Sequence, residues 1–330
     1  MNIQDVKKVE LHLHLDGSLR PNTVLELAKK DNIELPTYDV NELKKYLSVD
    51  EHNKDLVEYL KKFELPGKVM QTKENLSRVS YELVEDLAKE NYIYAEIRFA
   101  PHFHLEKGLT LDEVIEAVLK GIREATKKYD IKINLLLCIM RHLSVEKGFE
   151  ILNLVEKYIG KGVAGLDLAG DEFNYPATIF KEVFNVARNK GIPFTIHAGE
   201  AKGPESVWEA ISLGAKRLGH GIRSYEDKRL IDCLKKEDIA LECCPISNLH
   251  THAIKDFRNY PLKFYVENNI NACLNTDNRT VSNTNYQKEV DFLSSYIKID
   301  LEDVKKFNEN AINSAFINEE EKKELLNKLK

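Results

Sequence analysis

Short apolar segments alternate with longer amphipathic segments along most of the chain. Eight of the short segments have the length and composition of buried β-strands: Val9–Leu15, Tyr94–Ala100, Ile133–Met140, Gly165–Ala169, Pro193–His197, Arg217–His220, Ala240–Cys244 and Asn271–Asn275. Apolar residues recur at helical spacing in Leu111–Tyr129, Ser144–Ile159, Ala177–Asn189, Val207–Leu213, Glu226–Lys236 and Leu262–Asn268. This alternation predicts an α/β fold, a (β/α)8 TIM barrel that forms a single domain over residues 1–330.

The region 18–91, between the first two predicted strands, is much longer than one crossover helix needs. It contains four segments with a helical pattern: Thr23–Lys30, Val40–Leu47, Asp55–Phe63 and Leu76–Glu90. We predict a helical insertion after the first strand, on the face of the barrel that holds active sites. Four apolar residues of the insertion either cover the site as a lid or pack the insertion internally: Leu56, Tyr59, Leu60 and Phe63. Charged helices are expected at Leu301–Lys330.

Composition excludes several classes of protein. Hydrophobic residues make up 43% of the 330 positions and charged residues 31%, which is typical of a folded globular chain. A net charge of −6 argues against a nucleic-acid partner. No apolar run is long enough to span a membrane, and the polar start Met1–Asp5 leads us to expect no signal peptide. Five cysteines, an odd number without a Cys-x-x-Cys pair, suggest a cytoplasmic protein with free thiols.

Candidate chemistry begins with His12 and His14 in the first predicted strand. Residues two apart on a strand point to the same face, so the two imidazoles lie side by side. Two neutral imidazoles at this spacing can chelate one transition metal ion. The strand breaks at Asp16 and Gly17, which puts the pair at its C-terminal end. In a parallel barrel this is the end at which active sites are built.

Three further predicted strands end in residues of the same kind. His197 ends the fifth strand, and Glu200 follows it. His220 ends the sixth strand, between two glycines, and Asp277 follows the eighth. Each of these residues alone has a structural explanation, but together they meet at one end of the barrel. Three imidazoles and one carboxylate suit Zn²⁺, and a nearby glutamate can transfer protons. The sequence therefore predicts a hydrolytic metal site without an amino-acid nucleophile.

Six motifs occur in order along the chain: HLHLDGS at 12–18, DLAGDE at 167–172, HAGE at 197–200, LGHG at 218–221, CPISN at 244–248 and NTD at 275–277. This ordered set resembles adenosine deaminases, in the adenosine/AMP deaminase family of the metal-dependent amidohydrolase superfamily. The resemblance spans nearly the whole barrel. It implies hydrolytic deamination of adenosine, and of 2′-deoxyadenosine, to inosine and ammonia in purine salvage.

The resemblance also implies roles for particular residues. One zinc ion per chain would be bound by His12, His14, His197 and Asp277. A protonated Glu200 would donate to purine N1, while His220 and Asp277 position the attacking hydroxide. The residues implied to contact the substrate are His14, Gly170 through its N–H to purine N3, Asp16 at the ribose 5′-hydroxyl, and Asn278.

Asn278 departs from the family pattern, because many members carry a second aspartate there, in contact with purine N7. An amide can donate a hydrogen bond to N7 without an added proton. The departure leaves other aminopurines open as substrates: adenine, 5′-modified adenosines such as methylthioadenosine, and aminodeoxyfutalosine. The neighbouring Arg279 either binds an anion or pairs with a nearby carboxylate, and we expect the second.

Two other classes of protein share part of this pattern. Multi-metal phosphoesterases also begin a barrel with His-x-His and need further ligands, for which this chain offers His102, His104, His142, His250 and His252. Otherwise His102 and His104 either line the mouth of the pocket or have plain loop roles, and we expect the second. A zinc-stabilised binding protein would not need Glu200 and His220. We therefore predict an enzyme that binds one zinc ion, acts as a monomer on a small purine nucleoside, and has no nucleic-acid or membrane partner.

Overall fold

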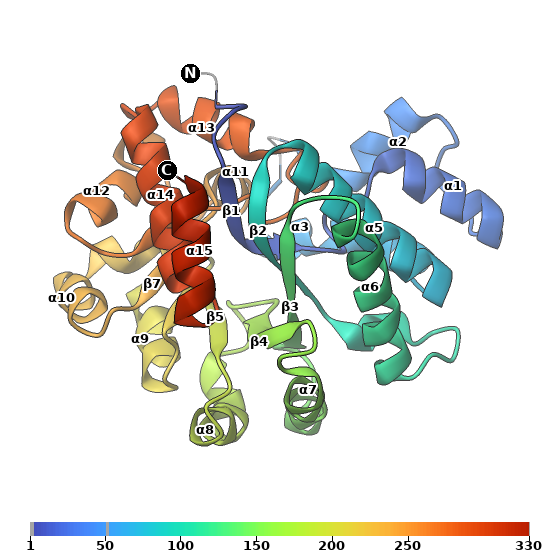
Figure 1. Ribbon diagram of the computed structural model, residues 1–330, viewed down its shortest axis with the longest axis horizontal. Helices are drawn as coiled ribbons and strands as arrows, with labels where there is room; N and C mark the ends of the chain where they lie inside the picture. Colours follow the sequence, from blue (N-terminus) through green and yellow to red (C-terminus); the bar gives the residue numbers. More distant parts are fainter. Residues whose placement is uncertain (1–2, 51–52, 330) are drawn as a thin grey trace.

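The computed structural model describes residues 3–50 and 53–329. Its eight strands form one parallel sheet in sequence order: β1 (Lys8–His14), β2 (Tyr92–Phe99), β3 (Lys132–Met140), β4 (Val163–Ala169), β5 (Phe194–Ala198), β6 (Arg217–His220), β7 (Ala240–Cys243) and β8 (Ala272–Leu274). A bridge between Leu13 and Asp277 brings the chain beyond β8 against β1. There the His14 N–H donates to the Asp277 carbonyl over 2.8 Å. This nearly closed barrel (Figure 1) confirms the predicted fold class.

Helices follow the strands around the barrel: α6 (Leu111–Thr126), α7 (Val145–Tyr158), α8 (Lys181–Asn189), α9 (Pro204–Ser212), α10 (Lys228–Lys236) and α12 (Leu262–Glu267), with short 3-10 helices η2 (Pro101–His104), η3 (Ala177–Phe180), η4 (Ile222–Glu226) and η5 (Phe257–Asn259). Helix α9 begins three residues before its predicted start, because Pro204 occupies the first turn, where its missing N–H costs nothing. The predicted helix Glu226–Lys236 begins later, at Lys228, since the Asp227 side chain caps it.

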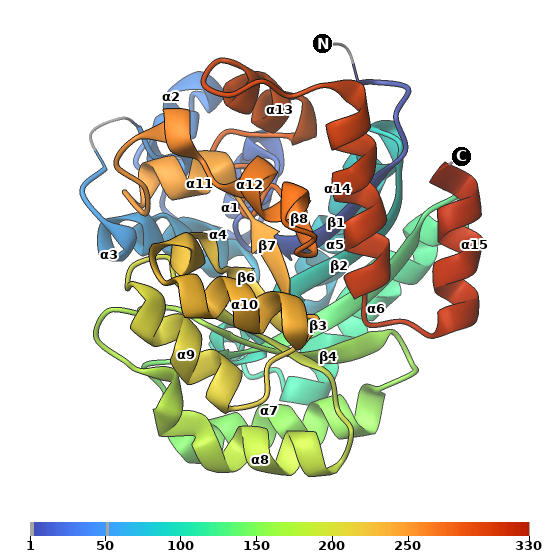
Figure 2. The ribbon, with the colours of Figure 1, turned by 90° about the vertical axis from the view of Figure 1, so that its left-hand side faces the viewer.

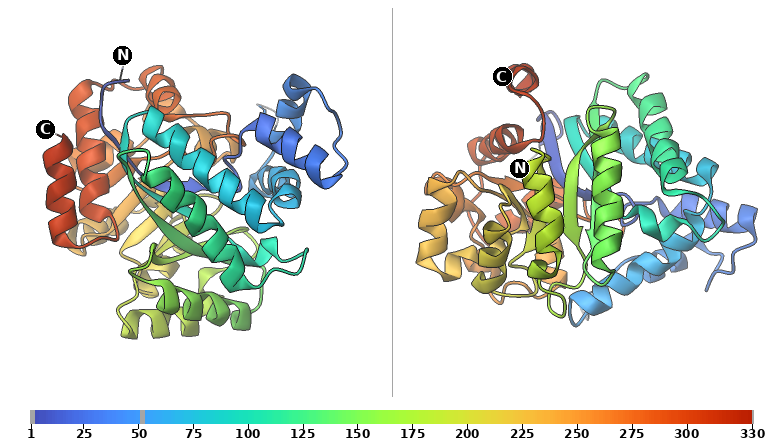
Figure 3. Two further views of the ribbon diagram at one scale, coloured as in Figure 1. Left: turned by 45° about the vertical axis from the view of Figure 1, so that its right-hand side comes forward. Right: turned by 90° about the horizontal axis from the view of Figure 1, so that it is seen from below.

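The insertion contains α1 (Pro21–Asp31), α2 (Val40–Leu47), α3 (Leu56–Leu60), η1 (Lys61–Phe63), α4 (Glu64–Val69) and α5 (Lys73–Lys89). Helices α1 and α2 project from one side of the barrel (Figures 1 and 3). The prediction of one helix at Asp55–Phe63 was wrong, because the segment divides into α3 and η1. Helix α4 was not predicted, since it contains Pro66 and Gly67, two poor helix formers.

The C-terminal segment forms α13 (Tyr286–Ser294), α14 (Leu301–Ser314) and α15 (Glu319–Leu329), and a short α11 (Pro245–His250) follows β7. Helices α14 and α15 lie side by side against the strands (Figure 2). Ala311 and Ile312 of α14 and Leu325 of α15 pack on Val9 and Leu11 of β1. The predicted C-terminal helices are thus present, although the sequence analysis missed α11 and α13.

One hydrophobic core joins the insertion to the barrel. Leu27 and Leu43 of the insertion belong to the same buried cluster as Leu135 and Leu166 of the sheet. A few positions of the predicted segments lie outside the described residues: 1–2 at the start of the domain, 51–52 in the insertion and 330 at the end of the C-terminal helices. Within the described ranges, no helix is long and apolar enough to cross a membrane.

Candidate active site

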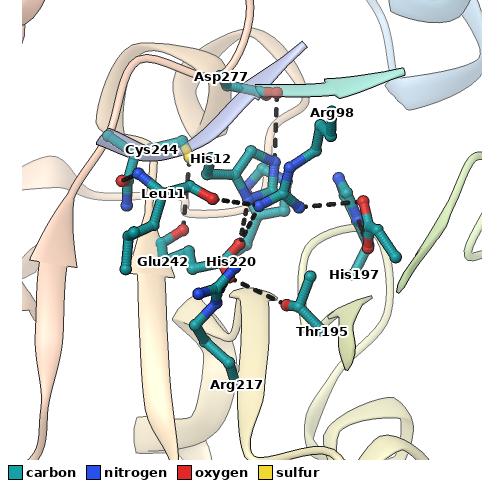
Figure 4. Close-up of polar contacts among 12 residues, drawn as sticks. Leu11, His12, Arg98, Thr195, His197, Arg217, His220, Glu242, Cys244 and Asp277 are labelled. Carbon is teal, nitrogen blue, oxygen red and sulfur yellow. Dashed lines mark hydrogen bonds and ion pairs between the residues drawn. The ribbon is translucent and has the colours of Figure 1, made fainter. Parts of the chain in front are cut away.

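Four predicted ligand side chains meet at the C-terminal end of the barrel. His12 and His14 lie on β1, His197 lies on β5, and Asp277 follows β8. Asp277 Oδ1 is 3.4 Å from the Nε2 atoms of both His12 and His14. The Nε2 atoms of His14 and His197 are 3.3 Å apart. Figure 4 shows three of these residues together with His220. The convergence agrees with the prediction that these strands bring their C-terminal ends to one end of the barrel.

These donor atoms fit one divalent metal ion. His12 Nε2 is buried and has no hydrogen-bond partner among the described residues, an arrangement that is costly without a ligand. Groups of three side chains able to hold an ion include His12, His14 and Asp277, and also His12, His197 and His220. Imidazole and carboxylate donors suit Zn²⁺ and similar ions. Distance alone therefore leaves His220 as an additional candidate ligand.

Two buried carboxylates orient the histidine rings. Glu242 of β7 lies 2.7 Å from His12 Nδ1, and Asp167 of β4 lies 3.0 Å from His197 Nδ1. Burial alone would raise the pKa of Glu242, but the guanidinium groups of Arg98 and Arg217 hold it well below its usual value. An ionised carboxylate accepts a hydrogen bond from the protonated Nδ1, so the Nε2 atom of the same ring is left free for a metal.

A chain of alternating charges extends from these carboxylates into the barrel (Figure 4). Arg98 donates to Asp167 over 3.0 Å and to Glu242 over 2.7 Å. Arg217 also bonds Glu242, and it donates to Glu96 over 2.5 Å. All five side chains are at most 1% exposed. The sequence analysis missed this network, although charged residues within otherwise apolar strands are a signal that they are paired.

Glu200 lies in the loop that follows β5, where Gly199 adopts a left-handed conformation with φ of 70°. Four consecutive backbone N–H groups, from Gly199 to Lys202, donate to the Glu172 carboxylate over 2.6–3.2 Å. The Glu200 side chain is buried and lies 3.4 Å from His220 Nε2. Burial first, and then the charges of Asp277 and Glu172, raise the pKa of Glu200 well above its ordinary value. The geometry thus favours a protonated carboxylic acid.

A cavity of about 500 Å³ opens above the cluster. The insertion residues Leu56, Tyr59, Leu60 and Phe63 line it, so they cover the site as well as packing on Val49 and Val281. His102 and His104 also line it, so the expectation of plain loop roles was wrong. The reason is that η2 turns both side chains inward: His104 is fully buried, and His102 is tied to Glu150 at 2.9 Å.

The predicted substrate-contacting residues border the same cavity: His14, Asp16, Gly170 and Asn278. Asp16 Oδ1 is buried without a partner among the described residues, and burial raises the pKa of Asp16 to about 7. Gly170 has φ of 101°, and a Cβ there would lie 3.2 Å from Met140. Asn278 Nδ2 donates to Asp277 Oδ1 over 2.7 Å. Arg279 pairs with Glu90, as expected.

An oxygen- and nitrogen-rich cluster at the C-terminal end of a (β/α)8 barrel is typical of metal-dependent hydrolases. The adenosine deaminase family model matches residues 7–330. Adenosine deaminases of Clostridium botulinum (strain 657) and Clostridium perfringens (strain SM101) are 47% and 45% identical to this chain, each over 98% of both chains. The chain therefore belongs to the adenosine deaminase family, which is metal-dependent.

Solved structures agree with this placement. The adenine deaminase from Arthrobacter aurescens superposes with a TM-score of 0.90 at 25% identity, over 98% of each chain. The N6-methyl-AMP deaminase from Arabidopsis thaliana gives a TM-score of 0.86 at 26% identity, over 99% of this chain and 97% of that one. Proteins of this fold thus differ in the aminopurine named as their substrate.

Proposed function

We propose that the protein is an adenosine deaminase, which hydrolyses adenosine and 2′-deoxyadenosine to inosine and ammonia in purine salvage. The observation that supports this most directly is the buried Glu200, whose pKa is raised well above its ordinary value, beside a three-histidine, one-aspartate cluster at the cavity. The adenosine deaminases that are 45–47% identical to this chain over nearly its full length add support.

His12, His14, His197 and Asp277 would hold the metal ion, for which we propose Zn²⁺, one per chain. When bound, zinc acts as a Lewis acid that lowers the pKa of water to about 7. Ionised Glu242 and Asp167 support this assignment, because they keep the Nε2 atoms of His12 and His197 unprotonated.

The chain's own groups would perform the remaining tasks. Glu200 donates its proton to purine N1, which makes C6 more electrophilic and so favours attack by water. His220 and Asp277 position that water beside the ring. The Gly170 N–H binds purine N3 at a point where a side chain would contact Met140. The unpartnered Asp16 oxygen accepts a hydrogen bond from the ribose, while His14 borders the sugar and Asn278 the purine.

We further propose that the chain is one domain and acts as a monomer in the cytoplasm. The common core of the insertion and the barrel supports one domain. Glu200, His220 and Asp277 border one cavity of this chain, so the chain itself supplies the proposed catalytic groups, which favours a monomer. Sedimentation of the pure protein tests this assignment, and a stable dimer would contradict it.

The multi-metal alternative has little support. Among the described residues, every group able to hold an ion belongs to the one cluster around His12 and Asp277. None of these groups contains the additional histidines that a phosphoesterase would recruit: His102, His104, His142, His250 and His252.

The deaminase assignment is tested by ultraviolet absorbance after zinc-loaded protein is mixed with adenosine. We expect the fall in absorbance that accompanies formation of inosine, and we expect dialysis against a chelator to abolish it until zinc is restored. Adenine, methylthioadenosine and aminodeoxyfutalosine are measured in parallel. If one of these compounds is turned over faster than adenosine, that compound replaces adenosine as the proposed substrate. Turnover that persists without metal would contradict the proposal.

Asn278→Asp is expected to raise the KM for adenosine about tenfold above neutral pH, with metal content unchanged. The ionised carboxylate cannot donate to N7, and one lost hydrogen bond of about 1.4 kcal/mol corresponds to this factor. Initial rates and metal analysis provide the measurement. The exposed Asn283→Asp is the control. Loss of metal from Asn278→Asp would mean that this residue supports the metal ligands instead of binding purine.

A further inference from the structure

Four imidazoles converge at the metal cluster, but the proposed ligand set uses only three. The ligand atoms of His12, His197 and His220 lie within 4.8 Å of one another. The ring centroid of His220 is 4.7 Å from that of His12 and 5.3 Å from that of His197. The distances between the rings therefore do not explain why His220 is not one of the proposed metal ligands.

The partner of Nδ1 distinguishes His220 from His12 and His197. The Nδ1 atoms of His12 and His197 face the carboxylates of Glu242 and Asp167. A carboxylate only accepts hydrogen bonds, so each Nδ1 carries a proton, and in the neutral ring Nε2 then has a free lone pair. His220 Nδ1 instead lies 3.1 Å from Nδ2 of Asn248, a side-chain amide that donates. A nitrogen that accepts this bond carries no proton.

The orientation of the Asn248 amide is set by Tyr260. The Tyr260 hydroxyl donates to Asn248 Oδ1 over 2.8 Å, and both side chains are buried. If the amide were turned over, its NH₂ would face the hydroxyl, and the Tyr260 proton would lose this acceptor. An unpaired buried donor costs about 1–3 kcal/mol, so the observed orientation is strongly preferred.

We propose that Tyr260 and Asn248 are positioning residues that fix His220 as the tautomer protonated at Nε2. This tautomer has no lone pair at Nε2, so His220 is excluded from the metal's ligand set. Its Nε2–H is instead a hydrogen-bond donor, 3.4 Å from Glu200 Oε2 and beside Asp277. The assignment of the tautomer stands on contacts alone, whereas its effect on turnover rests on the proposed function.

The experiment is ¹⁵N NMR of the zinc-loaded, full-length protein labelled at histidine. Two-bond proton–nitrogen correlations distinguish a protonated ring nitrogen from an unprotonated one, and His220→Asn identifies the signals of His220. In the wild type we expect His220 Nδ1 to be unprotonated and Nε2 protonated. A protonated Nδ1 in this spectrum would overturn the proposal, whether or not the protein deaminates adenosine.

Two variants test the positioning residues. Asn248→Asp replaces the donor with an acceptor, so we expect His220 Nδ1 to become protonated and kcat to fall about 10- to 100-fold. Tyr260→Phe frees the amide to turn over, so we expect a second set of His220 signals and a lower kcat with little change in KM. The matched control is Tyr265→Phe, because that buried hydroxyl bonds Ile222 and Tyr225 but not Asn248.

The outcomes separate positioning from general packing. If Tyr260→Phe and Tyr265→Phe both lower stability but only Tyr260→Phe changes the nitrogen signals of His220, the proposal is supported. If the signals of His220 are unchanged in Tyr260→Phe, the role of Tyr260 is overturned. If His220 Nδ1 is unprotonated in the wild type and remains unprotonated in Asn248→Asp, the role of Asn248 is overturned.

Discussion

Replacing Glu200 with glutamine is expected to lower kcat for adenosine about 10²- to 10⁴-fold, the usual contribution of one positioned acid–base group. Burial and the nearby carboxylates of Asp277 and Glu172 raise the pKa of Glu200 well above its ordinary value, which favours the protonated acid. A glutamine amide fills the same space and can still donate a hydrogen bond, but it cannot transfer a proton to purine N1.

Metal content and adenosine affinity separate this chemical effect from a structural one. Metal analysis should find the variant as fully loaded as the wild type, because the proposed ligands do not include Glu200. The control is Glu64→Gln, which makes the same change at an exposed residue that lines the cavity and pairs with Lys68. We expect its rate to stay within about threefold of wild type, since exposed ion pairs contribute little. A Glu200→Gln variant with near-normal kcat would remove Glu200 from the mechanism.

Much of the fold could be predicted because its signals are local. Each strand of the barrel is a short apolar run, and β3 and β6 match their predicted ranges within one residue at each end. The candidate ligands were found for a related reason. Parallel strands bring their C-terminal ends to one face, so His12, His197 and Asp277 meet although they are far apart in the sequence.

The features that were missed depend on tertiary packing. Pro66 and Gly67 disfavour a helix locally, yet α4 forms there. Pro66 is tolerated because it lies in the first turn, and Val69 is buried in the core. The inward position of His104 depends on η2, which has no apolar periodicity. The link from Tyr260 through Asn248 of α11 to His220 at the end of β6 joins segments whose relative positions the sequence does not specify.

The charged interior of the barrel could be foreseen only in part. Arg98, Arg217 and Glu242 lie inside apolar strands, where a charge is expected to have a partner. Which charges pair depends on the register of β2, β6 and β7, and no local pattern encodes that register. The sequence could therefore show that these groups are paired, but not that their chain of charges ends on the histidines.

Replacing Arg98 with methionine is expected to lower the free energy of unfolding by about 3–5 kcal/mol, since it leaves buried Asp167 without a guanidinium partner and Glu242 with Arg217 alone. Arg98 bonds Asp167 and Glu242, and all three side chains are fully buried. Methionine fills similar space but cannot donate. Proteins are stabilised by only about 5–15 kcal/mol in total, so this is a large fraction. The metal should also bind about 10- to 100-fold more weakly, because the same carboxylates orient His12 and His197.

Urea unfolding in the presence of a chelator measures the first effect, because the stabilisation that bound metal adds is then absent from both proteins. Arg20→Met is the matched control: Arg20 also bonds two carboxylates, Glu85 and Asp86, but its side chain is 32% exposed. We expect that control to cost less than about 1 kcal/mol. If Arg98→Met were no more destabilising than Arg20→Met, the buried charges would have to be solvated or neutralised in some other way, and the orientation of His12 and His197 could not depend on them.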